Sequence, residues 1–146
     1  MDVGDVALIR LRAATRMKLR ILGDTVRLRL LQSEVARLRE HGRVQETIHF
    51  GGDTWQAITY VVRCDVQLET LAAALDGLSI VVKIPEAMAH AWADGDEISL
   101  EGTQPIGGGR ELGILIEKDF KCLVPREGTE DSDAHEHPGK PAPAEA

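Results

Sequence analysis

The chain has 146 residues and a mass of 15.9 kDa, enough for one domain, because a chain of this size buries about two-thirds of its unfolded surface in a single core. Its composition is 43% hydrophobic and 28% charged, a globular balance that excludes wholesale disorder. The formal net charge is −7, yet basic residues outnumber acidic ones in residues 1–50 and acids dominate afterwards. We therefore expect the two halves to face different partners.

Cysteine usage and hydropathy indicate a cytoplasmic protein. Cys64 and Cys122 are too few for a disulfide framework and neither lies in a CxxC pair, which favours a reducing compartment. No apolar run in the sequence approaches the roughly 20 residues of a membrane-spanning helix, and Val6–Ile9 is too short for the core of a signal peptide. We therefore expect no membrane contact.

Three regions are predicted along the chain. Residues 1–16 show no strict hydrophobic period and are expected to form a loose extension; a short helix there and translation from Met17 both stay open. Residues 17–123 are predicted to form a single strand-rich α+β domain. Residues 124–146 are acidic, Pro-rich and without large apolar side chains, so they are expected to be a disordered tail.

The first predicted element is a β-hairpin. Apolar and basic residues alternate over residues 17–21 and again over 26–30, with Gly23-Asp24 between the two runs. A two-residue Gly-Asp loop is a favoured hairpin connection and sets Leu19 opposite Leu28. The same register sets two pairs of cations opposite each other, Lys18 with Arg29 and Arg20 with Arg27. Opposed like charges destabilise a sheet, so an anionic group is expected nearby.

The remaining elements follow in order. Ser33 is a predicted N-cap for a helix of about eight residues that ends at Gly42. Segment Gln67–Leu75 fits a helical period but is equally compatible with a linker that contains a short strand. Pro85 is expected at the first position of a second short helix, Glu86–Ala93. Strands are predicted at Val44–Phe50, Ile58–Cys64, Ile80–Ile84, Glu97–Glu101 and Leu112–Glu117.

A weak internal repeat places Arg27–Leu31 on Ile80–Ile84 and Gly42 on Gly95, with units at residues 17–64 and 76–123. The first unit, MKLRILGDTVRLRLLQSEVARLREHGRVQE, and the second, LSIVVKIPEAMAHAWADGDEISLEG, resemble the swapped-hairpin fold of the AbrB/MazE family. The resemblance implies a small barrel of swapped-hairpin or double-psi type. It also implies a homodimeric DNA-binding or antitoxin-like role, with nucleic-acid contact through Lys18, Arg20, Arg27 and Arg29.

The full span from Met17 to His137 is also similar to a family of short uncharacterised bacterial proteins. The similarity lies in the opening MKLRILGDTVRLRLLQSEVARL and in the late IEKDFKCL, which is followed by an acidic stretch ending near Pro138. This second resemblance implies no activity, cofactor or partner.

The basic face of the first hairpin is the main candidate site. Its four cations, Lys18, Arg20, Arg27 and Arg29, repel one another unless an anion lies between them. A phosphate, a carboxylate or a nucleic-acid backbone could supply that anion. The alternative is that Glu46, Glu40 or another acid of the chain neutralises the face, and that the charges keep an exposed strand from aggregating.

A rival hypothesis is a metal-binding or thiol-dependent protein. Its ligands would be Cys122, Asp133, His135 and His137, because thiolate and imidazole suit zinc, copper or nickel. A solvated tail and a structural cysteine are the alternatives. The sequence contains no GxSxG, Walker, GxGxxG or HExxH motif. The leading hypothesis is therefore a non-enzymatic binding or regulatory module, without a cofactor, for an anionic protein, ligand or DNA.

Overall fold

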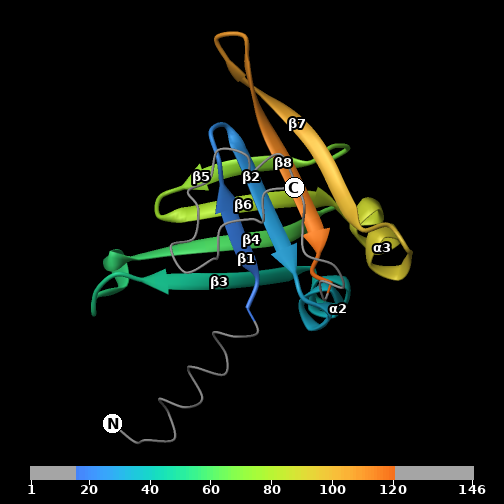
Figure 1. Cartoon of the computed structure of the whole chain (residues 1–146), viewed down its shortest axis with the longest axis horizontal. Helices are drawn as coiled ribbons and strands as arrows, with labels where there is room; N and C mark the ends of the chain where they lie inside the picture. Colours follow the sequence, from blue (N-terminus) through green and yellow to red (C-terminus); the bar gives the residue numbers. More distant parts are fainter. Residues whose placement is uncertain (1–15, 121–146) are drawn as a thin grey trace, which may run out of the picture.

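The computed structural model describes residues 16–120 of the chain, and two layers of β-sheet make up most of this part (Figure 1). One sheet has the strand order β1-β2-β8-β7 and the other the order β3-β4-β6-β5. The first sheet contains β1 (Lys18–Ile21), β2 (Thr25–Leu30), β7 (Ser99–Gly107) and β8 (Arg110–Lys118). The second sheet contains β3 (Arg43–His49), β4 (Ala57–Asp65), β5 (Ala72–Asp76) and β6 (Ser79–Pro85).

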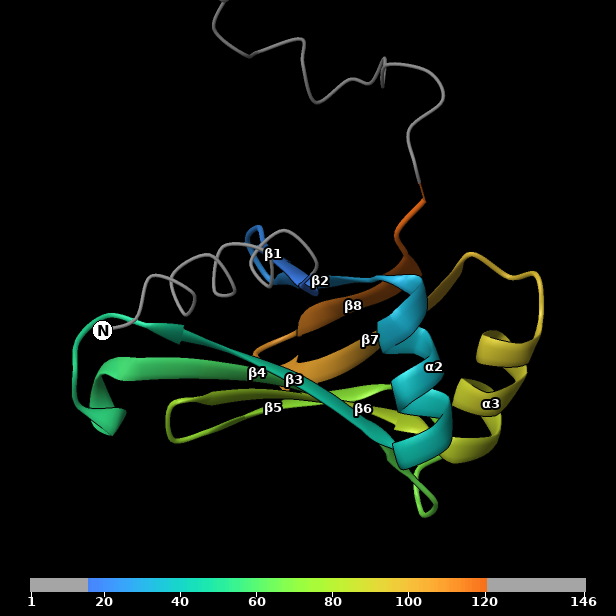
Figure 2. The same cartoon turned by 90° about the horizontal axis from the view of Figure 1, so that it is seen from below.

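Two α-helices in the described residues, α2 (Gln32–His41) and α3 (Glu86–Asp94), lie side by side at one end of the two layers (Figure 2). Each helix directly follows a strand, because α2 follows β2 and α3 follows β6. Helix α2 joins the first sheet to the second, and α3 joins the second sheet to the first. A short 3-10 turn, Thr54–Gln56, precedes β4.

The two sheets have the same connectivity. In the first sheet, hairpins β1–β2 and β7–β8 meet through the parallel pair β2 and β8. In the second sheet, hairpins β5–β6 and β3–β4 meet through the parallel pair β6 and β4. Corresponding places in the two sheets can therefore be compared residue by residue: the central buried pair is Leu28 with Ile116 in one and Val82 with Val62 in the other.

The strand-rich α+β class is confirmed, but the predicted barrel is wrong. The strands form two separate four-stranded sheets. Strands β1 and β7 are the edges of one sheet, and β3 and β5 are the edges of the other. Hydrophobic alternation is the same in a sandwich and in a barrel, so the sequence pattern could not distinguish them.

One core lies between the sheets and the helices. Leu28, Ile116, Val62 and Val82 are completely shielded from solvent, and Trp92 of α3 is 1% exposed. These side chains come from both sheets and a helix, so burial of the apolar strand faces is what holds the layers together. The other tryptophan, Trp55, is 68% exposed and lies outside this core.

The hairpin prediction is confirmed in register, because Leu19 lies opposite Leu28 and Arg20 lies opposite Arg27. Gly23 has a φ of 55°, which a two-residue hairpin loop needs and glycine adopts without strain. Of the two readings of segment Gln67–Leu75, the short strand is right, since β5 begins at Ala72.

The predicted N-cap Ser33 is wrong. Helix α2 begins two residues earlier than a cap at Ser33 implies, at Gln32, with Leu31 as its cap. The backbone N–H of Leu31 donates to the Glu34 carboxylate at 2.9 Å, and the N–H of Met17 donates to the same carboxylate at 2.7 Å. Glu34 is only 2% exposed, and this burial raises the pKa of its carboxyl group, although the two backbone hydrogen bonds oppose the rise.

The sequence alignment of the proposed repeat differs by one residue from the alignment that the two sheets give in the structure. Arg29 and Lys83 hold the same place beside the central buried pairs, whereas the sequence alignment matched Arg27 with Ile80. The caps agree with this shift, because Leu31 precedes α2 as Pro85 precedes α3. Residues 80–84 are all apolar except Lys83, so they carry too little alternation to set a register by sequence.

Candidate functional site

The four predicted cations lie together on the outer face of the first sheet. Their strands, β1 and β2, place Leu28 and Leu30 in the core, so the alternate residues point outward. A hollow of about 170 Å³ is lined by Lys18, Leu19, Arg20, Arg27 and Arg29. The structure therefore brings together all four residues of the predicted site, which we call the hairpin face.

Glu117 of β8 lies at the centre of the ion pairs on this face. Its carboxylate accepts hydrogen bonds from Arg27 Nε at 2.9 Å, from Arg27 Nη2 at 3.2 Å and from Arg29 Nε at 2.8 Å. The parallel pairing of β2 with β8 sets Glu117 directly opposite Arg29. Burial alone would raise the pKa of Glu117, but the hydrogen bonds and positive charges of the two arginines outweigh it and hold the pKa below its ordinary value.

A second acid, Asp119, pairs with Lys18 at 3.2 Å. The anions that the opposed cations require are therefore supplied at least in part by the chain itself. The acids suggested by the sequence are engaged elsewhere, because Glu46 pairs with Arg16 and Glu40 lies beside His41. Glu117 was missed because parallel pairing between β2 and β8 brings together segments 88 to 90 residues apart. Asp119 was missed for the same reason, because it directly follows β8.

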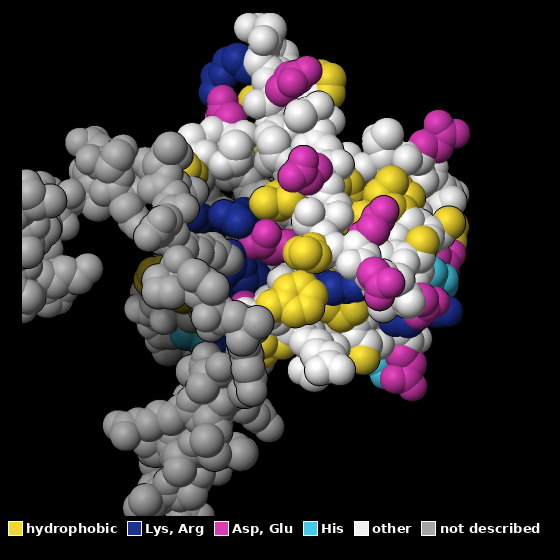
Figure 3. All heavy atoms as spheres, turned by 45° about the vertical axis from the view of Figure 1, so that its right-hand side comes forward, with side chains coloured by type: hydrophobic (Ala, Val, Ile, Leu, Met, Phe, Trp, Pro, Cys, Tyr) yellow, Lys and Arg dark blue, Asp and Glu magenta, His cyan; other side chains and the backbone are white. Residues whose placement is uncertain are grey.

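Lys and Arg side chains lie in contact with Asp and Glu side chains on the surface seen in Figure 3. The hairpin face follows this pattern, with four cations and the two acids Glu117 and Asp119. Four cations gather on this face, in a protein whose formal net charge is −7. The hairpin face is therefore a local basic site on an acidic protein.

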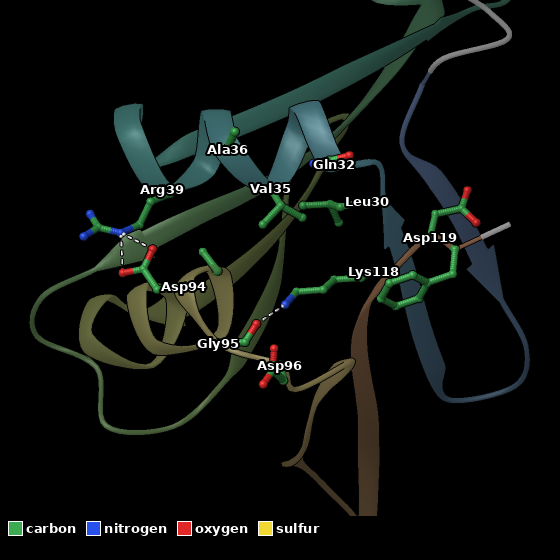
Figure 4. A pocket seen from close by; sticks show the side chains of 12 residues that line it. Leu30, Gln32, Val35, Ala36, Arg39, Asp94, Gly95, Asp96, Lys118 and Asp119 are labelled. Atoms are coloured by element: carbon green, nitrogen blue, oxygen red, sulfur yellow. Dashed lines mark hydrogen bonds and ion pairs between the residues drawn. The ribbon is translucent and has the colours of Figure 1, made fainter.

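A cavity of about 740 Å³ lies between the two helices and the end of β8 (Figure 4). Leu30, Val35 and Ala36 form an apolar wall. Arg39 and Asp94 point toward each other from α2 and α3, with Arg39 Nε at 3.1 Å from both carboxylate oxygens.

The polar groups of this cavity are largely satisfied by one another. Lys118 Nζ donates to the carbonyl oxygen of Gly95 at 2.9 Å and lies 5.5 Å from the centre of the Trp92 ring. Asp119 is already paired with Lys18. The cavity can accept a small amphipathic group, but its geometry shows no pair of groups arranged for acid-base or nucleophilic chemistry.

The residues of the rival metal hypothesis, Cys122, Asp133, His135 and His137, lie outside the described residues, as does the whole of segment 124–146. Within residues 16–120, no group of three or more His, Cys, Asp or Glu side chains could hold a metal ion. Cys64 is a free thiol in this part of the chain, and burial raises its pKa, which favours the unreactive protonated form.

None of the helices in the described part is both long and apolar enough to cross a membrane. Comparison with curated proteins finds no match. A family model described as a family of unknown function (DUF7009) matches residues 17–139, which include both sheets and both helices. The match confirms the similarity to an uncharacterised family and does not show the AbrB/MazE resemblance. The chain therefore belongs to the DUF7009 family of unknown function.

Proposed function

We propose that this protein is a non-enzymatic binding or regulatory module that engages an anionic partner through the hairpin face. One observation carries the proposal: Lys18, Arg20, Arg27 and Arg29 line one hollow. Glu117 organises the two arginines of β2, and Asp119 pairs with Lys18. An anionic group of the partner would be attracted to the four cations gathered here.

Duplex DNA is the sharpest form of this proposal. Its phosphate oxygens accept hydrogen bonds from Arg and Lys, and phosphate contacts need no base-specific groups on the protein. The resemblance to the AbrB/MazE family supports a transcription-regulatory or antitoxin-like homodimer. The twofold use of one strand connectivity is compatible with that resemblance. We place this function in the cytoplasm, where the free Cys64 thiol would stay reduced.

Fluorescence anisotropy of labelled duplex DNA tests the proposal. The test variant is Lys18→Gln/Arg20→Gln, because it keeps Arg27 and Arg29, which donate to the central Glu117 carboxylate. The matched control is Arg37→Gln/Arg110→Gln, which removes the same charge from exposed positions outside the hollow. Comparing the two separates the hairpin face from the effect of net charge.

We expect salt-sensitive binding by the wild type and the control, and loss of binding by the test variant. If Lys18 and Arg20 each neutralise one phosphate, a rise from 50 to 200 mM salt should weaken binding about tenfold. Absence of binding at low salt would rule out DNA as the partner. Equal weakening of both variants would show that net charge, rather than the hairpin face, is responsible.

A further inference from the structure

A second set of cations lies on the outer face of the other sheet. Strand pairing sets Arg43 of β3 directly opposite Arg63 of β4, and Arg63 directly opposite Lys83 of β6. The adjacent residues Val44, Val62 and Val82 are buried in the core, so these three cations point to the opposite side. We call them the cationic row.

The same place in the first sheet explains why the cationic row is unusual. The residue pair that follows the central buried pair along the strands is Arg29 with Glu117 in the first sheet. In the second sheet it is Lys83 with Arg63. Glu117 therefore corresponds to Arg63. The carboxylate that neutralises the first sheet is replaced by a third cation in the second sheet.

Compensation by the protein itself is weak here. Among the described residues, the Arg43 side chain donates only to the neutral side chain of Gln45, at 3.0 and 2.7 Å. Arg63 approaches Asp65 at 3.7 Å, and that carboxylate also accepts a backbone hydrogen bond from Gln67. No hydrogen bond or ion pair to the side chain of Lys83 is present within residues 16–120.

The cationic row borders a hollow of about 410 Å³ on this face. Val61 and Val81 lie in the next outward-facing row, and the hydroxyl-bearing residues Thr59 and Ser79 lie in the row after that. Asp76 is the acid at the far end of the hollow, level with Ser79. The hollow therefore has a basic end, an apolar middle and a hydroxyl-rich end.

We propose that the cationic row binds a ligand carrying two or more phosphate groups. Neighbouring strands lie about 4.8 Å apart, so three cations on adjacent strands present positive charge over roughly 10 Å, which is wider than a single phosphate group. Linked phosphate groups place charge along that span and accept hydrogen bonds from both arginines. The site is independent of the proposed function, because it lies on a different sheet.

Isothermal titration with tripolyphosphate, at constant ionic strength, tests this site. Arg63→Glu places a carboxylate where the first sheet has Glu117, so it should abolish binding. Lys83→Gln is the milder variant and should weaken binding at least about tenfold, the equivalent of about 1.4 kcal/mol. Arg37→Glu, at an exposed position on α2, is the control with the same charge change as Arg63→Glu and should bind as the wild type does.

Two results would overturn the inference. Tripolyphosphate binding that survives both Arg63→Glu and Lys83→Gln would show that the row is not the site. Binding abolished by Lys18→Gln/Arg20→Gln would assign the phosphate to the hairpin face instead. Failure of DNA binding leaves this site intact, because that assay reports on the first sheet, so the two proposals fail separately.

Discussion

Glu117→Gln tests whether an internal carboxylate holds the hairpin face together. The glutamine keeps the shape of the side chain but loses the charge and turns an amide N–H toward the guanidinium groups. Charge-assisted hydrogen bonds are worth about 1.5–3 kcal/mol, whereas exposed ion pairs contribute about 0.2–1 kcal/mol. The side chain of Glu117 is 12% exposed and those of Arg27 and Arg29 are 28% and 20% exposed, which places this site between the two cases.

We therefore expect Glu117→Gln to lower the free energy of unfolding by about 2 kcal/mol and Tm by roughly 10 °C. Thermal melts followed by circular dichroism, together with urea unfolding, measure both quantities. Glu111→Gln is the matched control, because Glu111 is an exposed residue of the same strand, and it should change Tm little. A Tm for Glu117→Gln equal to that of the control would refute the reasoning.

The same variant also reports on pH and on binding. Because the folded pKa of Glu117 is depressed, its stabilisation is present above the ordinary pKa of glutamate and is lost as the pH falls through the folded value. The stability of the wild type should therefore approach that of Glu117→Gln in acid. At neutral pH the variant leaves Arg27 and Arg29 without their acid, so its affinity for DNA should rise several-fold. An unchanged affinity would count against the hairpin face as the binding site.

Three further predictions concern stability. Glu34→Gln should remove a pH dependence of stability that is opposite in sign to that of Glu117. Because the pKa of Glu34 is raised, its contribution to stability is greatest below the ordinary pKa of glutamate and is lost as the pH rises through the folded value. Urea unfolding across about pH 3–8 measures this dependence. Gly42→Ala should cost about 1 kcal/mol in urea unfolding, because Gly42 ends α2 with a φ of 74°, and Gly52→Ala is its control. Gln104→Leu should speed hydrogen exchange of the Ala73 amide, because the Gln104 side chain bonds both the N–H and the carbonyl oxygen of Ala73 in the edge strand β5. An unchanged exchange rate would contradict this role.

Local structure was largely predictable from the sequence. The register of the first hairpin followed from alternation and from the Gly23-Asp24 loop, because side chains on a strand alternate and a two-residue loop leaves one pairing. The end of α2 at Gly42 followed from the conformational freedom of glycine. The start of α2 could not be predicted in the same way, because the carboxylate of Glu34 replaces a cap at Ser33 and also accepts a hydrogen bond from the distant Met17.

The sequence by itself determined the strand-rich α+β class, the hairpin and the grouping of four cations on one of its faces, because these depend on neighbours along the chain. The tertiary structure alone decided that the strands form two open sheets, that Glu117 lies between Arg27 and Arg29, and that Arg43, Arg63 and Lys83 form one row. Each of these depends at least in part on parallel pairing between strands that are not consecutive in the sequence. Such pairing is set by burial of both sheets in a common core, and it cannot be predicted from local hydrophobic periodicity.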